Sequence, residues 1–399
     1  MILITGPEEE RRMEPIYMDN AATTFPKPEE VARAVQDYMT GVGANVGRGS
    51  YRSAYAAEEA VYETRVLLAE LFGAPECRNV AFTANVTQSL NAALKGLLRE
   101  GDHVITSSME HNAVMRPLRQ LERHGVSFTR CPCTERGELR TDRLEECLRP
   151  ETRAVVMTHA SNVCGTVTPL EKVGAFCRAH GLLFIVDCAQ TAGVLPIDVQ
   201  AMNVDVLCFT GHKGLLGPQG IGGLVLREGL AARMEPLISG GTGSVSHTEQ
   251  VPDFMPDRLE AGTLNLPGIM GLRAGLLWLR RTGLARVYAH EQELTQAFLE
   301  GLEGLTAEGV LVPVGLPGVQ GRTGVVSLRM LRGDPAEWAC RLDEKYGIMT
   351  RVGLHCAPAA HRTLGTFPEG TVRFSFGWWN TPEQVAAAVG ALEEIGHGI

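Results

Sequence analysis

The stretch VDVLCFTGHKGLLGPQGIGG, residues 204–223, joins an apolar segment to a glycine-rich turn and carries Lys213 just past the apolar part. The apolar part predicts a buried strand, and the small residues after it predict a turn at the mouth of a pocket. A lysine forms Schiff bases with aldehydes when burial and nearby cations lower the pKa of its amine. The other interpretation is a surface lysine in a loop, and this segment alone favours neither.

A second apolar segment, LLFIVDCAQTAG at residues 182–193, ends in Asp187, and Gln190 follows three positions later. The cofactor pyridoxal 5′-phosphate needs a carboxylate at its pyridine nitrogen, because the protonated ring is the electron sink for a carbanion at the substrate's α-carbon. Asp187 fits this role, although a lone strand-end aspartate more often caps the next turn. The two segments together, D-x-x-Q followed by T-G-H-K, are much more specific than either one.

With these segments the chain resembles the class V aminotransferase superfamily of fold-type I pyridoxal-phosphate enzymes. Within it, the chain is similar to the cysteine desulfurase and selenocysteine lyase family of the group II kind. The resemblance covers nearly the whole chain, from YMDNAATT at 17–24 to TVRFSFGWWNT at 371–381. It implies an α/β fold in which a large domain has a mostly parallel seven-stranded sheet and a smaller C-terminal domain is α+β.

The pattern along the chain agrees with such a fold, because apolar strands alternate with helical patterns as in βαβ units with helices on both faces of a sheet. We expect a large cofactor-binding domain at 15–267 and a small C-terminal domain at 268–399. The small domain would include the N-terminal segment and carry the catalytic-cysteine loop. The loop 241–257 has no clear period and is expected near the site or a dimer interface. The expected strands are near 79–83, 103–107, 154–159, 182–187, 205–210 and 221–227, and the expected helices are near 56–72, 87–99, 112–124 and 169–180.

Further residues would hold the cofactor. In FTANVTQSLNAAL, Val86 and Thr87 lie where a helix begins, so backbone N–H groups there could hold a phosphate. The alternative is a simple Asn/Thr helix cap. The resemblance implies the other contacts: stacking on the ring by His111, hydrogen bonds near the 3-hydroxyl from Asn162 and Gln190, and phosphate contacts from Thr87, Thr210, His212 and Thr263 of the partner subunit.

The segment TRVGLHCAPAAHRTLGT at 350–366 separates a desulfurase from an ordinary aminotransferase. A desulfurase needs a thiolate on a mobile loop that attacks the substrate's sulfur and carries it as a persulfide. R-x-G-x-H-C-A resembles the group II signature, with Cys356 as the acceptor and His355 beside it. The alternative is one more buried cysteine among ten, but flanking glycine, proline and histidine residues favour the functional interpretation.

Arg373 lies on an expected strand in GTVRFSFG, where a guanidinium could bind an α-carboxylate through two parallel hydrogen bonds. The alternative is a strand arginine that faces solvent. Two positions depart from the group II pattern: Gly47 stands where many relatives have histidine, and Leu354 replaces the first of two histidines before the cysteine. These departures leave open the proton donors near the sulfur and the choice between cysteine and selenocysteine.

Composition sets the class of protein but not its chemistry. The 399 residues are 44% hydrophobic with a net charge of −9, enough for a large core. The acidic balance argues against nucleic-acid and anionic-membrane partners. Ten cysteines without CxxC pairs suggest neither disulfides nor a metal site and suit a reducing cytosol. We find no signal-peptide pattern and no apolar run of membrane-spanning length, so we expect a cytoplasmic protein.

We therefore expect a homodimeric pyridoxal-phosphate enzyme that converts L-cysteine to L-alanine and leaves the sulfur on Cys356. Lys213 would be both the cofactor's anchor and the base for the α-proton, while Arg373, Asn162 and His355 would face the substrate. A sulfur-acceptor protein could follow as a partner. The alternatives are a selenocysteine lyase, another class V aminotransferase or an epimerase, and a catalytically silent protein of the same fold that only binds a sulfur-transfer partner.

Overall fold

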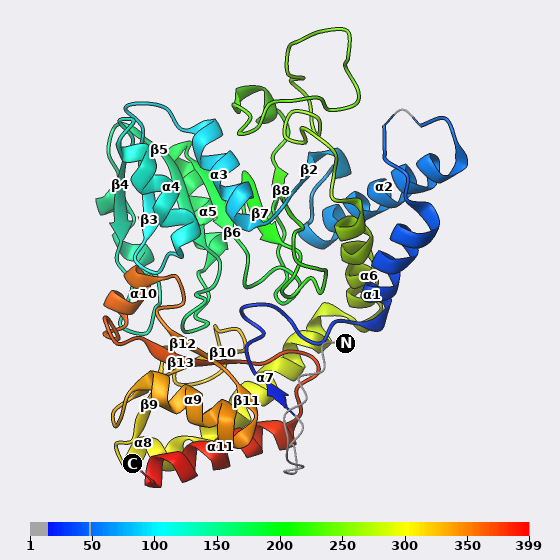
Figure 1. Cartoon of the computed structure of the whole chain (residues 1–399). Coiled ribbons are helices and arrows are strands. Elements are labelled where there is room, and N and C mark those ends of the chain that lie inside the picture. Colours follow the sequence, from blue (N-terminus) through cyan, green and yellow to red (C-terminus); the bar gives the residue numbers. More distant parts are fainter. Residues whose placement is uncertain (1–14, 48, 399) are drawn as a thin grey trace.

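Seven strands form the central sheet of the larger part of the molecule (Figure 1). The computed structural model describes residues 15–47 and 49–398. Neighbouring strands in this sheet are parallel except at β8, which runs antiparallel to both β2 and β7. In spatial order the strands are β2 (Val80–Thr83), β8 (Gly222–Leu226), β7 (Val206–Thr210), β6 (Leu183–Asp187), β5 (Thr152–Thr158), β3 (His103–Ser107) and β4 (Ser127–Cys131).

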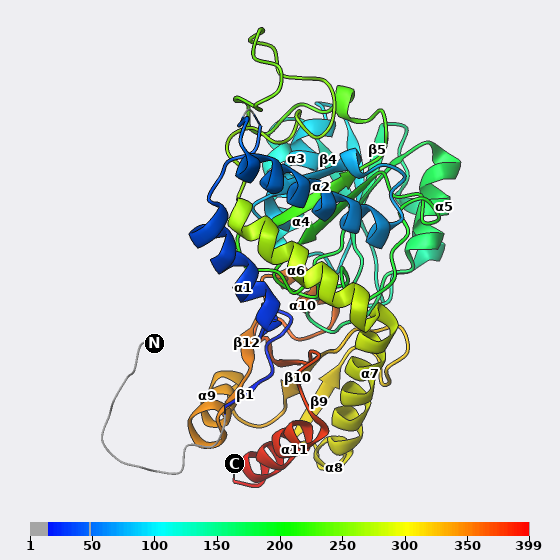
Figure 2. The ribbon, with the colours of Figure 1, turned by 90° about the vertical axis from the view of Figure 1, so that its right-hand side faces the viewer.

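Helices cover both faces of this sheet, because its inner strands are apolar on both sides. Phe184 and Val186 belong to the core on one face, and Ile185 between them belongs to the core on the other. α1 (Glu29–Asp37) packs on the outside of α6, and Figure 2 shows α1, α2 and α6 together on one side. The first core is closed by α2 (Arg52–Phe72), α5 (Leu170–His180) and α6 (Leu266–Thr282), and the second by α3 (Val86–Leu97) and α4 (Asn112–Glu122).

The smaller part is built on a four-stranded antiparallel sheet with its own core around Trp338, Phe298 and Phe374. The N-terminal segment also belongs to this smaller part, because β1 (Ile16–Tyr17) pairs in parallel with β11 (Ile348–Met349) in a separate two-stranded sheet. The sheet order is β12 (Arg351–Gly353), β13 (Thr371–Ser375), β10 (Val325–Met330) and β9 (Leu311–Val314). The helices of this part are α7 (Leu284–Gly301), α8 (Glu303–Ala307), α9 (Pro335–Tyr346), α10 (Pro358–Thr363) and α11 (Pro382–His397).

The predicted fold class is confirmed, with a mostly parallel seven-stranded sheet and a smaller α+β part. The sequence patterns missed β4, α1 and β9. The division at residues 267 and 268 stays a prediction: α6 packs on α1 and α2, whereas α7 packs on α11. No helix in the described part of the chain is long and apolar enough to span a membrane.

Candidate active site

Lys213 lies three residues beyond β7, in a turn with glycines on both sides. Burial lowers the pKa of its amine, the charges of Arg373 and Arg351 add to this shift, and those of Asp187 and Asp19 oppose it, so that the pKa is about 8. An amine with a pKa near 8 is partly neutral at physiological pH and can therefore act as a nucleophile or a base. The predicted pocket lysine thus has the electrostatic surroundings that this chemistry needs.

Asp187 ends β6, the strand next to β7, so the two carboxyl strand ends bring it near Lys213. Its side chain is 3% exposed, and Oδ1 accepts a hydrogen bond from the Ala189 N–H at 3.0 Å. Burial raises the pKa of this carboxyl, while the Ala189 N–H and the charge of Lys213 lower it. A carboxylate in this setting can hold a proton on a ring nitrogen.

His111 caps α4, which follows β3. Its Nδ1 accepts a hydrogen bond from the Ala113 N–H at 3.0 Å, so a neutral ring carries its proton on Nε2. Burial, and then the charge of Lys213, lower the pKa of His111 to about 4. The ring is therefore neutral at physiological pH, which suits a stacking partner.

No role was predicted for Glu110, the residue before His111. Glu110 is fully buried and accepts hydrogen bonds from Ser107 Oγ at 2.5 Å and from the Thr158 N–H at 3.0 Å. Burial raises the pKa of Glu110 to about 8. This side chain links the ends of β3 and β5 below His111, and the sequence gives no sign that a loop glutamate is buried.

Two polar atoms in and beside the Lys213 turn, Thr210 Oγ1 and His212 Nδ1, are buried without a hydrogen-bond partner among the described residues. Buried polar groups are nearly always hydrogen-bonded, so these two atoms fit a phosphorylated cofactor held beside Lys213. Gln190 Nε2 donates to the Ala21 carbonyl at 3.1 Å.

The phosphate contacts expected elsewhere lie on exposed segments. Val86 and Thr87 begin α3, whose cap is the Asn85 side chain. Thr263 is exposed and lines a cavity of about 200 Å³ with Ala84 and Gln88, beside the same helix end. Their roles, including the contact from Thr263 of the partner subunit, stay predictions.

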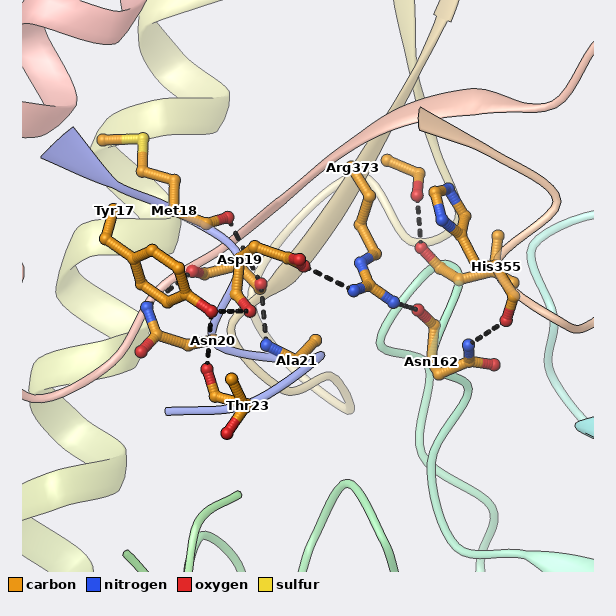
Figure 3. Close-up of polar contacts among 12 residues, drawn as sticks. Tyr17, Met18, Asp19, Asn20, Ala21, Thr23, Asn162, His355 and Arg373 are labelled. Carbon is orange, nitrogen blue, oxygen red and sulfur yellow. Dashed lines mark hydrogen bonds and ion pairs between the residues drawn. The ribbon is translucent and has the colours of Figure 1, made fainter. Parts of the chain in front are cut away.

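Arg373 is 2% exposed on β13 and forms a network with two other segments (Figure 3). Its Nη2 donates to Asp19 Oδ1 at 2.6 Å, and its Nη1 donates to the Asn162 carbonyl at 3.1 Å. Nε is buried and has no hydrogen-bond partner within residues 15–47 and 49–398. Asn162 in turn donates from Nδ2 to the His355 carbonyl at 2.7 Å. No role was predicted for Asp19, although it lies in the quoted segment YMDNAATT.

Cys356 is exposed and follows this network directly. His355 and Cys356 both have positive φ, +46° and +57°, a backbone conformation that non-glycine residues rarely adopt outside functional sites. The Cys356 carbonyl accepts from the Asn112 N–H at 2.8 Å, which ties the loop to the start of α4. The predicted loop that carries Cys356 is therefore a turn, fixed by this hydrogen bond and followed by α10.

His355 itself is 4% exposed, and its Nε2 pairs with Thr371 Oγ1 at 2.9 Å. Burial lowers the pKa of His355 to about 2, so the ring carries no charge that could stabilise a neighbouring thiolate. Of the two departures from the family pattern, Leu354 precedes this residue, whereas Gly47 lines a cavity with Thr263. Gly47 and Thr263 thus lie together within one subunit.

Comparison with known proteins agrees with this geometry. A family model described as "Aminotransferase class-V" matches residues 16–387. A "Probable cysteine desulfurase" of Methanothermobacter thermautotrophicus is 34% identical over 387 residues, covering 95% of this chain and 94% of the relative. "Cysteine desulfurase IscS" of Glaesserella parasuis is 33% identical over 391 residues, covering 93% and 90%.

Among solved structures, the apo structure of a cysteine desulfurase from Thermococcus onnurineus superposes with a TM-score of 0.90 at 33% identity, covering 96% of this chain and 95% of that one. The chain belongs to the class-V aminotransferase family. This family uses pyridoxal 5′-phosphate, the cofactor that the sequence predicted.

Proposed function

We propose that this protein is a pyridoxal-phosphate-dependent cysteine desulfurase that converts L-cysteine to L-alanine and takes the sulfur on Cys356 as a persulfide. The observation that carries the proposal is the position of Cys356: an exposed thiol on a turn whose preceding carbonyl is held by Asn162, which also contacts Arg373. An ordinary aminotransferase has no use for a nucleophile there. The relatives named as cysteine desulfurases support the same conclusion.

Lys213, Asp187 and His111, with Thr210 and His212, would hold the cofactor. When bound, it supplies the electron sink that stabilises negative charge at the substrate's α-carbon. Asp187 would keep the ring nitrogen protonated, and His111, being neutral, would contact the ring without adding charge.

Arg373 would orient the substrate, and Lys213 would remove its α-proton. The free Nε of Arg373 can donate to the α-carboxylate, while Asp19 and Asn162 keep the guanidinium in place. The Lys213 amine would move the substrate's α-proton, because its pKa near 8 suits a base at neutral pH.

Cys356 completes the reaction as the thiolate that attacks the substrate's sulfur. A new S–S bond forms as the C–S bond breaks, and the electron pair of the C–S bond stays with carbon, which takes up a proton. The products are L-alanine and a persulfide on Cys356. An exposed thiol also lets a sulfur-acceptor protein approach.

We further propose a cytoplasmic homodimer. Large apolar side chains are exposed near the start of α2 and on the loop around 236–262, and residues of the two segments line one cavity. Exposed apolar patches of this kind mark protein interfaces. All ten cysteines are free, which suits a reducing compartment. The apolar residues are Met39, Val42, Tyr51, Tyr55, Tyr62, Leu237, Ile238 and Phe254.

The test is to assay the purified protein for alanine release from L-cysteine and from L-selenocysteine side by side. Alanine from cysteine with matching sulfide or persulfide supports the desulfurase. Turnover of selenocysteine alone would make the protein a selenocysteine lyase. Release of no alanine from either substrate, with amino-group transfer to a keto acid, would make it an aminotransferase.

A further inference from the structure

A small cavity lies between the two parts of the molecule, beside the turn that carries Lys213. Its volume is about 40 Å³. Since roughly 10–15 Å³ on this measure holds one water, the cavity has room for one dehydrated alkali cation or a few waters. Its walls come from α6, α7, the N-terminal segment around Asn20, the turns after β6 and β7, and the segments before β10 and after β13. The lining residues include Gln190, Lys213, Trp278, Glu291, Thr323 and Trp378.

Glu291, on α7, is an unpaired acid in this cavity. Its side chain is 8% exposed, and burial raises the pKa of its carboxyl to about 8. In the described part of the chain, no residue donates a hydrogen bond to this carboxyl or forms an ion pair with it. A buried carboxylate is costly unless a counter-charge or hydrogen-bond donors accompany it, so the side chain must carry a proton or meet a cation.

Other oxygens face the same space. Thr323, which is 2% exposed, lines the cavity, and its Oγ1 has no hydrogen-bond partner in the part of the chain that the structure describes. A methyl group added at Gly324 would lie 3.4 Å from Glu291 Oε2 and 3.5 Å from the Phe376 carbonyl oxygen. The Glu291 carboxyl and the Phe376 carbonyl oxygen therefore both lie close to Gly324. Carboxylate, hydroxyl and carbonyl oxygens are the ligands that hard cations prefer.

Aromatic rings add to this environment. Trp278 and Trp378 both line the cavity, with ring centroids 5.4 Å apart in an edge-to-face arrangement. Indole faces attract cations, most strongly where water is excluded. A single carboxylate with two neutral oxygens and two indoles matches one positive charge better than two, and no group of three metal-binding side chains occurs among the described residues.

We propose that this cavity binds one monovalent alkali cation, K⁺ or Na⁺, which neutralises Glu291 and joins the two parts of the molecule. The other charged or titratable groups around it are Tyr288 and His290 on α7, Arg286 over the Trp378 ring, and Lys213. The Lys213 amine interacts with Asp187 and Asp19 at the active site. The cation is therefore the counter-charge that Glu291 lacks.

The experiment titrates the holoenzyme at pH 9 with KCl or NaCl in a buffer whose own cation is N-methylglucamine, which is too large for the cavity. Melting temperature and tryptophan fluorescence are measured, since Trp278 and Trp378 report on the site. We expect a saturable rise in melting temperature with a change in fluorescence. Choline chloride at equal ionic strength should produce neither. Below pH 8 the apparent affinity should fall about tenfold per pH unit, because a proton competes for the carboxylate.

Glu291→Gln should abolish both responses, and the matched control Glu293→Gln, an exposed position on the same helix, should keep them. If Glu291→Gln does not fold, Thr323→Val, which removes one ligand without changing shape, should weaken the affinity. Equal responses in wild type and Glu291→Gln, or none to K⁺ or Na⁺ in wild type, would overturn the proposal and leave a cavity of water beside a protonated acid. None of these measurements depends on turnover, so failure here leaves the desulfurase proposal intact.

Discussion

Arg373 and Asp19 form an ion pair of 2.6 Å between positions 354 residues apart, with side-chain exposures of 2% and 18%. Asp19 and the Asn162 carbonyl each accept one N–H from an Nη group of the guanidinium, so the Nε–H and one N–H on each Nη remain for a substrate. The substrate's carboxylate can therefore bind without displacing Asp19. Asp19 fixes the direction of the guanidinium before the substrate arrives.

Arg373→Lys should raise KM for cysteine and leave cofactor content unchanged. A lysine keeps the charge but loses the planar fork, and one charged hydrogen bond is worth about 1.5–3 kcal/mol, or roughly a 10- to 100-fold change in KM. Steady-state kinetics with cofactor quantification check this. The control is Arg329→Lys, at an exposed position on β10. An unchanged KM in Arg373→Lys would remove Arg373 from the substrate site.

Asp187→Asn should lower kcat while the fold survives. Loss of the charge that keeps the ring nitrogen protonated should cost on the order of 2–4 kcal/mol in the transition state. Circular dichroism and kcat, measured with the exposed Asp253→Asn as control, separate folding from chemistry. A variant with near-wild-type kcat would make Asp187 a structural cap of the Ala189 turn.

Cys356→Ala should bind cofactor and cysteine but form no protein persulfide. Mass spectrometry of wild type after brief exposure to cysteine should place one added sulfur on the peptide that contains Cys356. Cys340→Ala is the matched control, because Cys340 is also exposed but lies on α9. A persulfide on another cysteine, or normal cysteine turnover in Cys356→Ala, would falsify the acceptor role. With selenocysteine the variant should keep activity, since a selenol is ionised at neutral pH.

Covalent attachment of pyridoxal phosphate to cofactor-free protein should depend on pH through the Lys213 amine. Only the neutral amine attacks an aldehyde, and its pKa is about 8. Below pH 8 the rate should therefore rise about tenfold per pH unit, and above pH 8 it should level off. Stopped-flow absorbance measures the rate, and borohydride reduction with peptide mapping identifies the lysine. Lys213→Ala should show no attachment, and a rate that keeps rising to pH 10 would contradict the lowered pKa.

Glu260→Ala should destabilise the larger part of the molecule. Glu260 accepts two hydrogen bonds from Arg65, at 2.8 and 2.5 Å, and both side chains are under a tenth exposed. Removing the acid leaves a buried guanidinium unpaired, which should lower the free energy of unfolding by roughly 3–5 kcal/mol. Denaturant titration checks this. Glu228→Ala breaks the exposed Arg78 pair and should cost at most about 1 kcal/mol.

The sequence predicted the residues whose position depends on local pattern. Lys213 and Asp187 directly follow or end apolar runs of strand length, and parallel pairing brings such strand ends together. β4 was missed because its sequence, SFTRC, is mixed and only its last residue is buried, as is common for an edge strand. Nothing local marks it as part of the sheet.

Other features of the site depend on tertiary structure alone. The pairing of Arg373 with Asp19 joins opposite ends of the chain, and the burial of Glu110 depends on Thr158 from another strand. The positive φ of Cys356 also has no sequence signal, since glycine would be expected there. Such contacts exist only once segments that are far apart in the sequence have come together.

The pairing of Ile16 with Ile348 can form only late in the synthesis of the chain. β1 has no partner until Ile348 has been made, a wait of roughly 20–70 seconds at 5–20 residues per second. A nascent chain that ends before Ile348 already contains Lys213 and Asp187 but neither Cys356 nor Arg373. Lys213 is therefore synthesised well before Cys356. The active site is among the last parts of the molecule to be completed.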